Sequence, residues 1–484
     1  MGRRRPMTYR QAAEWLEALA DPERTGLDRR FARRMNLDAT RRLMELLGDP
    51  HERLAAVHIA GTKGKGSVAA MVEAAARAAS HRTGMFTSPH LVSWRERVRI
   101  NGQPITEEEV ARLASAVRPA VEQVEEEGLR GPSFFEACTA MALLRFAEED
   151  LDLCVVEVGL GGRLDATNVV APLMSVITTL GIDHAHVLGD TLAGIAQQKA
   201  GIIKPGVPVV SAQQPSEARV IIQHAAAAQA SPLRFAEPFE VGEVTPLRPR
   251  DAVPGDPPLL TEPLEGGYAG ARVALRLPLA GEHQAINAGV AAAVCEGLSE
   301  AGLEVPPEAF VDGLEGVRWP ARVQVVDVRP WVVIDCAHNQ QSARALMRAL
   351  RRHLVCRRLI VVLGLSEDKP AEVVAGELSS ADHAILTRAC LPRAMPAEEL
   401  AERTGAIWRS HEVVADPVQA LAHARETAEE RDAICVTGSF FVLADLMEAG
   451  ALPAPDQQRV GWRRPVNDER LGGSEDTAAP DGNG

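Results

Sequence analysis

The sequence predicts a two-domain α/β protein, in which a larger domain on a mostly parallel sheet precedes a smaller α/β domain. The chain has 484 residues, more than one ordinary hydrophobic core holds. Short apolar runs alternate with helical stretches in both halves, as expected when helices cover both faces of a parallel sheet. Residues 54–60 form an apolar run that ends in a glycine-rich loop and continues into an Ala-rich helix. This strand–loop–helix order is typical of a phosphate-binding unit.

The elements of the larger domain are expected from the spacing of apolar residues. The expected strands are residues 54–60, 153–157, 175–179 and 207–211. The expected helices are residues 9–19, 38–48, 67–79, 192–200 and about 284–301. Residues 232–280 combine many prolines with alternating apolar residues, and we expect a small β-rich subregion there.

The smaller domain is expected to follow a linker in the Pro-containing stretch 303–320. We therefore place the domains at residues 1–316 and 317–452. The expected strands of the second domain are residues 323–328, 332–335, 359–363, 384–387 and 433–436. Residues 453–484 are poor in apolar side chains and rich in Pro, Gly, Asp and Arg, which predicts a disordered tail.

The composition disfavours several functional classes. A net charge of −14 leaves no broad basic face for nucleic acid, and 4% aromatic residues give no base-stacking platform. A small anionic substrate remains possible, because it needs only a local basic pocket. The seven cysteines form no CxxC pair, and no apolar run reaches membrane-spanning length. We expect a cytoplasmic protein that binds neither nucleic acid nor membranes.

The strongest local motif is the glycine-rich loop Gly61–Ser67. Glycines let successive backbone N–H groups point at phosphate oxygens, and the helix that follows adds positive potential. Lys65 is expected to reach the terminal phosphates, and the Ser67 hydroxyl to face a phosphate or its Mg²⁺. Gly66 separates these two residues, so the match to GxxxxGK[ST] is imperfect. An ordinary glycine-rich turn is the alternative, which the flanking strand and helix disfavour.

Two further candidates directly follow expected strands. Glu157 ends a buried strand, at the edge where open parallel sheets bind ligands, and Mg²⁺ beside nucleotide phosphates is its natural partner. A salt bridge to Arg163 is the alternative. His184 lies just past another strand, but a lone histidine is more often structural, and Mg²⁺ prefers oxygen ligands.

Two residues carry weaker signals. Lys199 lies late in a helix, where a cation near the negative end of the helix dipole is the plain interpretation. Asp335 ends a strand of the second domain and suits a ribose hydroxyl or an amine, while Asn339 is equally suited to cap the next helix.

A series of short motifs follows in order along the chain. In the first domain these are GTKGKGS (61–67), TGMFTSPHLV (83–92), ERVRING (96–102), SFFEACTAMAL (133–143), EVGLGGRLDATN (157–168), GIDHAHVLG (181–189), QKAGIIKPGVPVV (198–210) and GEHQAINA (281–288). In the second domain they are WPARV (319–323), DCAHN (335–339), EDKP (367–370), PRAMPAEEL (392–400) and VTGSF (436–440). Together they resemble the folylpolyglutamate synthase/dihydrofolate synthase family, a branch of the Mur ligase superfamily, from about Tyr9 to Glu448.

The resemblance implies a P-loop ATPase-type first domain, a smaller Rossmann-like glutamate-ligase domain and an active site in the cleft between them. It implies ATP contacts at Gly61, Thr62, Gly64, Lys65, Gly66, Ser67, Asn287, Arg322 and Asp335. It implies Mg²⁺, expected as two ions, at Ser88, Glu157 and His184. It implies a carbamate on Lys199, with Lys199, His184 and Lys65 as the catalytic residues. It places glutamate at His338 and Ser439, and the pterin-side pocket at Ser133, Phe134, Phe135, Glu136, Leu164, Asp165 and Ala166.

The implied reaction is ADP-forming: ATP phosphorylates a folate-type carboxylate, and the amine of glutamate attacks the acyl phosphate. The second domain would close over the site and exclude water. The resemblance favours a monomer. The choice between dihydropteroate and tetrahydrofolate depends on the loops at 21–36 and 132–136.

Four positions depart from the family pattern. Lys63 stands where Asn is usual and adds a charge beside the phosphates. The other departures are Gln198 for Glu, Ala321 for Gly and Cys336 for Gly. None of them removes an expected ligand.

Two alternatives are weighed against this interpretation. A peptidoglycan-type Mur ligase carries a separate substrate domain before the phosphate loop, and only 60 residues precede it here. A regulatory protein that binds ATP without using it is disfavoured by the combination of Glu157, His184 and Lys199.

Overall fold

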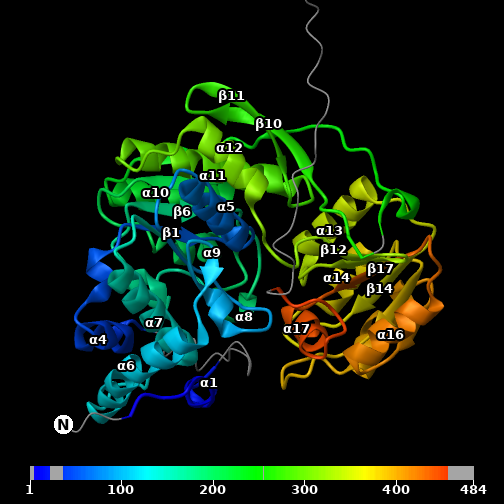
Figure 1. Ribbon diagram of the computed structural model, residues 1–484, viewed down its shortest axis with the longest axis horizontal. Coiled ribbons are helices and arrows are strands. Elements are labelled where there is room, and N and C mark those ends of the chain that lie inside the picture. The colour runs from blue at the N-terminus through cyan, green and yellow to red at the C-terminus, as the bar shows by residue number, and fades with distance from the viewer. Residues whose placement is uncertain (1–4, 22–35, 254, 456–484) are drawn as a thin grey trace, which may run out of the picture.

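The computed structural model describes residues 5–21, 36–253 and 255–455, which form two α/β lobes (Figure 1). The first lobe contains an eight-stranded sheet in the order β4-β3-β2-β5-β1-β6-β7-β8. Its strands are β1 (Ala56–Ala60), β2 (Thr83–Phe86), β3 (Val98–Ile100), β4 (Gln103–Pro104), β5 (Leu153–Glu157), β6 (Met174–Ile177), β7 (Val209–Ser211) and β8 (Leu233–Phe235). From β2 to β8 all neighbours are parallel, and β3 and β4 form an antiparallel edge. The prediction of a mostly parallel sheet is confirmed.

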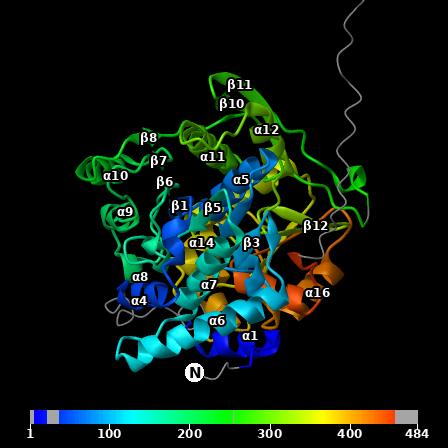
Figure 2. The ribbon, with the colours of Figure 1, turned by 60° about the vertical axis from the view of Figure 1, so that its left-hand side comes forward.

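Helices cover both faces of this sheet (Figure 2). The helices of the first lobe are α1 (Tyr9–Ala18), α4 (Asp38–Leu46), α5 (Lys65–Ala78), α6 (Glu107–Glu126), α7 (Phe134–Glu149), α8 (Ala185–Leu188), α9 (Leu192–Ala200), α10 (Ser216–Ala228), α11 (His283–Glu300) and α12 (Pro307–Gly316). Alternate residues of β1 enter the two cores: Val57 and Ile59 pack with α5 and α11, and Ala56 packs with α6 and α7. Because both faces are buried, the strands read as continuous apolar runs in the sequence.

The β-rich subregion is present, with one difference from the prediction. A separate antiparallel sheet has the order β11-β10-β9 and consists of β9 (Glu240–Val241), β10 (Glu262–Tyr268) and β11 (Ala271–Leu277). The first strand of the region, β8, instead pairs in parallel with β7 and extends the large sheet.

The expected linker 303–320 is shorter than predicted, because most of it is helix α12. Phe310 and Leu314, one turn apart, are fully buried against α5 and α11. The prolines that suggested a linker start this helix, with Pro306 at the N-cap and Pro307 in the first turn. The connection between the lobes is therefore the short stretch 317–323.

The second lobe contains a six-stranded sheet in the order β12-β13-β17-β14-β15-β16, in which only the β12–β13 pair is antiparallel. Its strands are β12 (Gln324–Val328), β13 (Trp331–Ile334), β14 (Leu359–Leu363), β15 (His383–Leu386), β16 (His411–Val413) and β17 (Ala433–Thr437). Its helices are α13 (Gln340–His353), α14 (Ala371–Leu378), α15 (Ala397–Thr404), α16 (Pro417–Thr427) and α17 (Phe440–Glu448). Helices α13 to α15 pack on one face, and α16 and α17 on the other.

Five short 3₁₀ helices complete the described elements: η1 (Pro50–Arg53), η2 (Trp94–Arg97), η3 (Ala166–Val169), η4 (Pro249–Asp251) and η5 (Gly405–Ile407). The expected tail lies almost wholly outside the described residues, as does most of the loop at 21–36. In the described part of the chain, no helix has the length and apolar character needed to cross a membrane.

Away from the sheet ends, a buried ionic contact joins the lobes. Glu262 on β10 is fully buried, and its carboxylate accepts hydrogen bonds from Arg352 Nε at 2.7 Å and from the backbone N–H of Gly281 at 2.9 Å. His353 Nε2 lies 2.9 Å from the same carboxylate. Both second-lobe partners are at the end of α13.

Candidate active site

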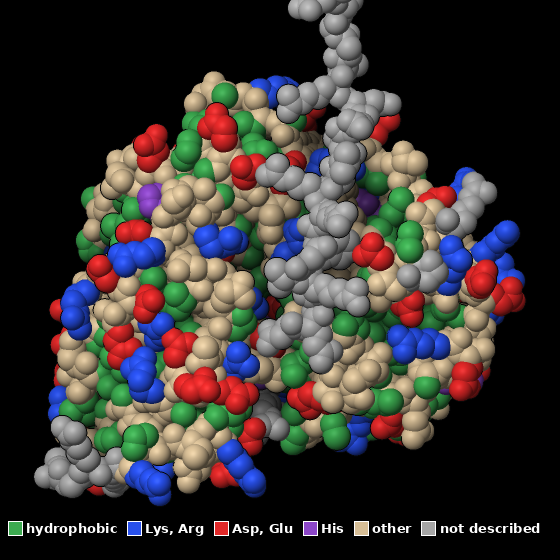
Figure 3. Space-filling model, in the orientation of Figure 1, with side chains coloured by type: hydrophobic (Ala, Val, Ile, Leu, Met, Phe, Trp, Pro, Cys, Tyr) green, Lys and Arg blue, Asp and Glu red, His purple; other side chains and the backbone are tan. Residues whose placement is uncertain are grey.

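A cavity of about 480 Å³ lies where the two lobes meet. It is lined by the loops that follow β1, β2, β5 and β6 of the first lobe and β13, β14 and β17 of the second. These are the carboxyl ends of parallel strands, the usual position of a ligand site in open α/β sheets. On the face drawn in Figure 3, acidic and basic side chains of the described residues are interspersed.

The phosphate loop connects β1 to α5 and is shaped by glycines. Gly64 caps α5 with a φ of +87°, a left-handed conformation that favours glycine, and a Cβ there would lie 2.2 Å from Asn287 Oδ1. The backbone N–H groups of Thr62 and Lys63 both donate to Thr179 O, at 3.1 and 3.0 Å. The loop is thus fixed to the segment after β6 and approached closely by Asn287.

The carboxylate of Glu157, at the end of β5, lies beside this loop. Glu157 is 4% exposed, Lys65 Nζ lies 3.7 Å from its Oε1, and the N–H of Ser88 donates to Oε2 at 3.2 Å. Burial raises the pKa of Glu157, and the Lys65 ammonium opposes this shift only in part. The alternative salt bridge to Arg163 is wrong, because that side chain is exposed and Glu157 pairs with Lys65.

Lys199 is buried in the last turn of α9, rather than lying exposed at the helix end. It is 5% exposed, and its Nζ donates to Gly161 O at 3.5 Å. Burial, together with repulsion from Lys65, lowers the pKa of Lys199 to about 7. A neutral amine is therefore well populated at physiological pH.

His184 lies at the N-terminus of α8 with a φ of +51° and lines the cavity. Burial and the Lys369 ammonium lower the pKa of His184 to about 3, so its imidazole is neutral at physiological pH. Neutral imidazole is the form that binds metals.

From the second lobe, Arg322 and Asp335 enter the same cavity. The Asp335 carboxylate accepts the N–H groups of Val323 at 2.9 Å and Ala337 at 2.8 Å. Ala321 and Val323 flank Arg322 with φ values of +56° and +47°. Both are left-handed conformations that strain residues with a Cβ, which explains why a glycine would suit position 321.

The two residues expected to hold glutamate also line the cavity. His338 Nδ1 is 2.8 Å from Cys336 O, and burial lowers the pKa of His338 to about 4. Ser439 is the N-cap of α17 and accepts the N–H of Phe441 at 3.1 Å. Asn339 is the N-cap of α13, as one of the two interpretations of this segment predicted.

On the opposite side of the cavity, the start of α7 forms the expected pterin-side wall. Ser133 and Glu136 form a capping box, and Arg130 Nη2 donates to Glu136 Oε1 at 2.6 Å. Phe135 lines the cavity. Phe134 was expected there too, but it is buried in the first-lobe core, where Arg97 lies 5.1 Å from its ring centre. One step along a helix turns a side chain by about 100°, so neighbours at a helix start point in different directions.

The turn after β5 completes this wall with Leu164, Asp165 and Ala166. The Asp165 carboxylate accepts the N–H groups of Leu160 and Thr167 and the Thr167 hydroxyl, at 2.8, 3.0 and 2.5 Å. These bonds assign its carboxylate to shaping the turn, while Leu164 and Ala166 present apolar surface.

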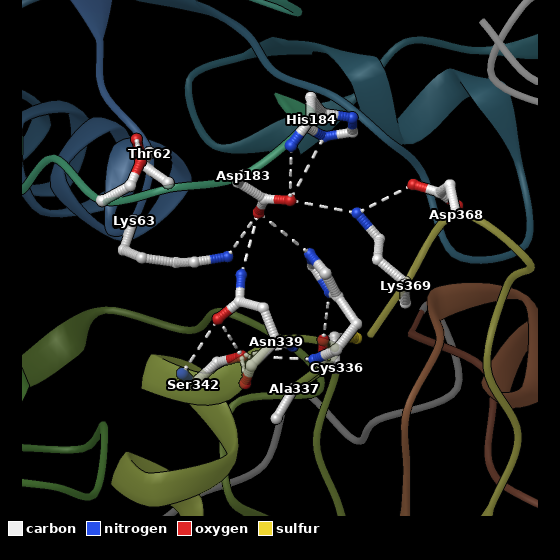
Figure 4. A network of polar contacts seen from close by, with 12 residues as sticks. Thr62, Lys63, Asp183, His184, Cys336, Ala337, Asn339, Ser342, Asp368 and Lys369 are labelled. Atoms are coloured by element: carbon white, nitrogen blue, oxygen red, sulfur yellow. Dashed lines mark hydrogen bonds and ion pairs between the residues drawn. The ribbon is translucent and has the colours of Figure 1, made fainter. Parts of the chain in front are cut away.

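Asp183 lies at the centre of a cluster of polar side chains (Figure 4). It was not among the site residues expected from the sequence. Its carboxylate accepts hydrogen bonds from Lys63 Nζ at 2.9 Å, Asn339 Nδ2 at 2.8 Å and Lys369 Nζ at 3.0 Å. Although burial alone would raise the pKa of Asp183, the neighbouring Lys63 holds it far below its usual range. The charge of Lys63, expected beside the phosphates, is thus paired with an acid. A local signal existed, since Asp183 follows a strand and precedes His184.

Lysines are rare in the chain but concentrated in this cavity. Five of the 52 basic residues are lysines. Four of them, Lys63, Lys65, Lys199 and Lys369, line the cavity. The fifth, Lys204, donates to Asn168 O at 2.8 Å elsewhere.

Comparisons with known proteins agree with this arrangement. The model of the Mur ligase glutamate ligase domain matches residues 321–440. A dihydrofolate synthase/folylpolyglutamate synthase of Bacillus subtilis (strain 168) is 32% identical over 445 residues, which cover 90% of this chain and 98% of that protein.

Two solved structures have the same fold over most of their length. A folylpolyglutamate synthase of Mycobacterium tuberculosis complexed with ADP and AMPPCP gives a TM-score of 0.77 at 32% identity, with 86% of this chain and 96% of that chain covered. E. coli FolC in complex with DHPP and ADP gives 0.76 at 28% identity, with 91% and 97% covered. The chain belongs to the folylpolyglutamate synthase/dihydrofolate synthase family.

Proposed function

We propose that this protein uses ATP to join L-glutamate to a folate-type carboxylate, releasing ADP and phosphate. The observation that carries the proposal is the single cavity in which the phosphate loop, Glu157 and Lys199 of the first lobe face Arg322 and His338 of the second. Family membership supports an ADP-forming ligase, and related proteins form complexes with ADP.

The ATP phosphates would lie in the loop between β1 and α5. Lys65 and the backbone N–H groups at the start of α5 would hold them, with Ser67 close by. Asn287 approaches the loop from α11, while Arg322 and Asp335 reach the nucleotide from the second lobe. A nucleotide bound there would contact both lobes.

Mg²⁺ would bind beside these phosphates, with Ser88, Glu157 and His184 as protein ligands. The donor set suits it, because Glu157 is a buried carboxylate that its lysine neighbour compensates only in part. Among the described residues, no group of three or more His, Cys, Asp or Glu side chains could hold a metal ion alone. The cation would therefore share its coordination with phosphate oxygens and the Ser88 hydroxyl. When bound, it neutralises phosphate charge and polarises the transferred phosphoryl group.

Lys199 would carry a carbamate, formed when its neutral amine adds CO₂ and releases a proton. Its burial and its pKa of about 7 provide the neutral amine that this addition requires. The product is an anion that would be attracted to the neighbouring Lys65 ammonium. Because the chain has only five lysines, ¹³C NMR of protein equilibrated with ¹³CO₂ would resolve the carbamate. A Lys199→Ala spectrum that retained the signal would contradict the assignment.

The chemistry needs an activated carboxylate, since oxide is a prohibitive leaving group. A carboxylate oxygen of the folate attacks the γ-phosphorus, the bond to ADP breaks, and an acyl phosphate forms. The amine of glutamate then attacks the acyl carbon, phosphate leaves, and the amine releases a proton. Lys65 and Arg322 would stabilise the charge that develops on the phosphoryl oxygens. His338 and Ser439 would orient glutamate for its attack.

The folate-type substrate would occupy the wall formed by Ser133, Phe135, Leu164 and Ala166. A related protein, E. coli FolC, has been solved in complex with a ligand named DHPP. We propose dihydropteroate and tetrahydrofolate as the two candidate acceptors, because related proteins are named for both activities.

The test is ADP release by purified protein with ATP, Mg²⁺, glutamate and either dihydropteroate or tetrahydrofolate. We expect ADP only when both the acceptor and glutamate are present, with a product heavier by one glutamyl residue in mass spectrometry. A regulatory protein that binds ATP without turnover, or a ligase for a different amino acid, would give no such dependence. The resemblance favours a monomer in the cytoplasm, which sedimentation and cell fractionation would check.

A further inference from the structure

The Asp183 cluster is the polar contact between the lobes that touches the phosphate loop. Lys63 is part of that loop, and Asp183 follows β6, so both belong to the first lobe. Lys369 follows β14 and Asn339 caps α13, so both belong to the second. Figure 4 shows the three donors converging on the Asp183 carboxylate.

Each oxygen of Asp183 has a second-lobe partner. Oδ2 accepts from Lys63 at 2.9 Å and from Asn339 at 2.8 Å, and Oδ1 accepts from Lys369 at 3.0 Å. His338 Nε2 lies 3.6 Å from Oδ2. The Asp183 and Lys369 side chains are 10% and 8% exposed, so their attraction is poorly screened by solvent.

The first-lobe side of the cluster is rigidly connected to the phosphate loop. The Thr62 hydroxyl donates to Gly181 O at 3.0 Å, and the N–H groups of Thr62 and Lys63 donate to Thr179 O. The loop and the segment bearing Asp183 therefore move together.

The second-lobe side is equally constrained. Asn339 uses its Oδ1 to accept the N–H of Ser342 at 3.1 Å, so its Nδ2 is fixed toward Asp183. Lys369 is also 3.2 Å from Asp368. Any movement of Asp183 is thereby transmitted to the start of α13, beside His338.

We propose that Asp183, with Lys63, Asn339 and Lys369, forms an interlobe latch that positions the glutamate-binding residues of the second lobe against the phosphate loop. Asp183 and Lys63 are positioning residues in this assignment. It rests on the proposed function for the identity of the amino-acid substrate. Lys63 thus acts on the glutamate side of the reaction, although it lies in the phosphate loop.

The latch makes a prediction that a phosphate-binding role for Lys63 does not. Loss of the latch leaves Lys65 and the loop backbone in place, so nucleotide binding to the first lobe persists. It loosens the second lobe at the cavity, although the contact between Glu262 and Arg352 remains, so that glutamate must bind to a less ordered site. Glutamate affinity therefore falls strongly. The affinity for the nucleotide falls less, because Lys65 and the loop backbone of the first lobe keep their contacts and only those of Arg322 and Asp335 are weakened.

The test compares Lys63→Met, Asp183→Asn and Asp183→Glu with the parent protein. We expect the KM for glutamate to rise about tenfold or more in D183N and about three- to tenfold in K63M, as for loss of a buried charge partner. The rise in the KM of D183E should lie between those of the other two variants. The Kd for AMPPCP, measured by calorimetry, should rise less than the KM for glutamate, by at most about threefold. Glu377→Gln is the matched control, because it removes an exposed ion pair with Arg344 on the second lobe. That variant should keep all parent values.

Small-angle scattering adds a readout that needs no turnover. D183N and K63M should show a larger radius of gyration than the parent protein in saturating AMPPCP, and E377Q should not. The latch is overturned if K63M weakens AMPPCP binding about tenfold and leaves the KM for glutamate unchanged, or if the scattering profiles coincide. If D183N fails to fold, K63M alone decides. If the parent protein ligates no glutamate, calorimetry and scattering still test the latch independently of the proposed function.

Discussion

Three lysines of the cavity, Lys63, Lys369 and Lys199, fall into two groups with contrasting surroundings. Lys63 and Lys369 share the carboxylate of Asp183, at 2.9 and 3.0 Å. Lys199 is 5% exposed and has a carbonyl oxygen at 3.5 Å as its hydrogen-bond partner. Its pKa falls to about 7 because burial disfavours the ammonium form and Lys65 repels it.

Burial lowers the pKa of Lys63 as it does that of Lys199, but the carboxylate of Asp183 opposes the shift at Lys63. The counter-ion therefore changes what burial does to a lysine. An ammonium that faces a buried carboxylate holds two segments together. Each charge, if left without its partner, would bear an uncompensated desolvation cost. A buried amine without such a partner gives up its proton and becomes a nucleophile. In the proposed function, the cavity thus has a structural side at Asp183 and a chemical side at Lys199.

Removal of the chemical lysine should have the largest effect. We expect Lys199→Ala to lower kcat by about 10³-fold or more, because the proposed carbamate beside the ATP phosphates cannot form. The thermal unfolding midpoint should stay near that of the parent protein. Acetate in the assay should restore part of the activity by replacing the carbamate.

Lys204→Met is the control for that experiment. Because Lys204 lies outside the cavity, this substitution should leave kcat unchanged. Full activity of Lys199→Ala would show that Lys199 does not differ in function from the lysines that pair with Asp183. Activity lost together with the folded state would instead assign Lys199 a structural role.

Substitution of Glu157 should have the next largest effect on activity. Glu157→Gln keeps the shape of the side chain but removes its charge. We expect kcat at limiting Mg²⁺ to fall by about 100-fold and to recover in part at high Mg²⁺. Titration of ADP release with Mg²⁺ measures both effects. An unchanged Mg²⁺ requirement would show that Glu157 serves Lys65 alone.

These two groups also mark the limit of sequence-based prediction. Glu157 and the bounds of β5 and β14 were predictable, because buried parallel strands are continuous apolar runs that end abruptly at their ligand edge. The contact between Asp183 and Lys369 spans 186 residues, and no local pattern records such a pairing. Lys63 stood out as an unusual residue, yet its partner could only be found in three dimensions.

Two errors had local physical causes. Helix α12 was predicted to be a linker because of the prolines at its start. The apolar residues Phe310 and Leu314, which pack this helix into the core, follow those prolines. Phe134 and Phe135 look equivalent in the sequence, and only the position of the first turn of α7 turns one toward the cavity and the other into the core. The expected contributions of residues 22–35 stay predictions.

The pH dependence of carbamate formation should be a smaller effect, of about tenfold. The pKa of Lys199 is lowered to about 7, so the neutral amine that adds CO₂ predominates above pH 7 and becomes scarce below it. At fixed dissolved CO₂, the initial rate at which the ¹³C carbamate signal appears should be about tenfold lower at pH 6 than at pH 8, because this rate follows the fraction of neutral amine. A rate that is flat between pH 6 and pH 8 would place the pKa of Lys199 below this range, and a change of about 100-fold would place it above.

The smallest effect on activity should come from a buried carboxylate outside the cavity. Glu262 contacts Arg352 and His353 as Asp183 contacts its lysines, but it does not line the cavity. Glu262→Gln should lower the free energy of unfolding by about 2 kcal/mol, because Arg352, whose side chain is 23% exposed, loses its hydrogen bond to a buried carboxylate. Urea denaturation measures this loss, and kcat of the folded fraction should stay within about threefold. If the KM for glutamate rose as far as in Asp183→Asn, the two carboxylates would be equivalent interlobe contacts. The specific importance of Asp183 would then lie in holding the lobes together, and not in its link to the phosphate loop.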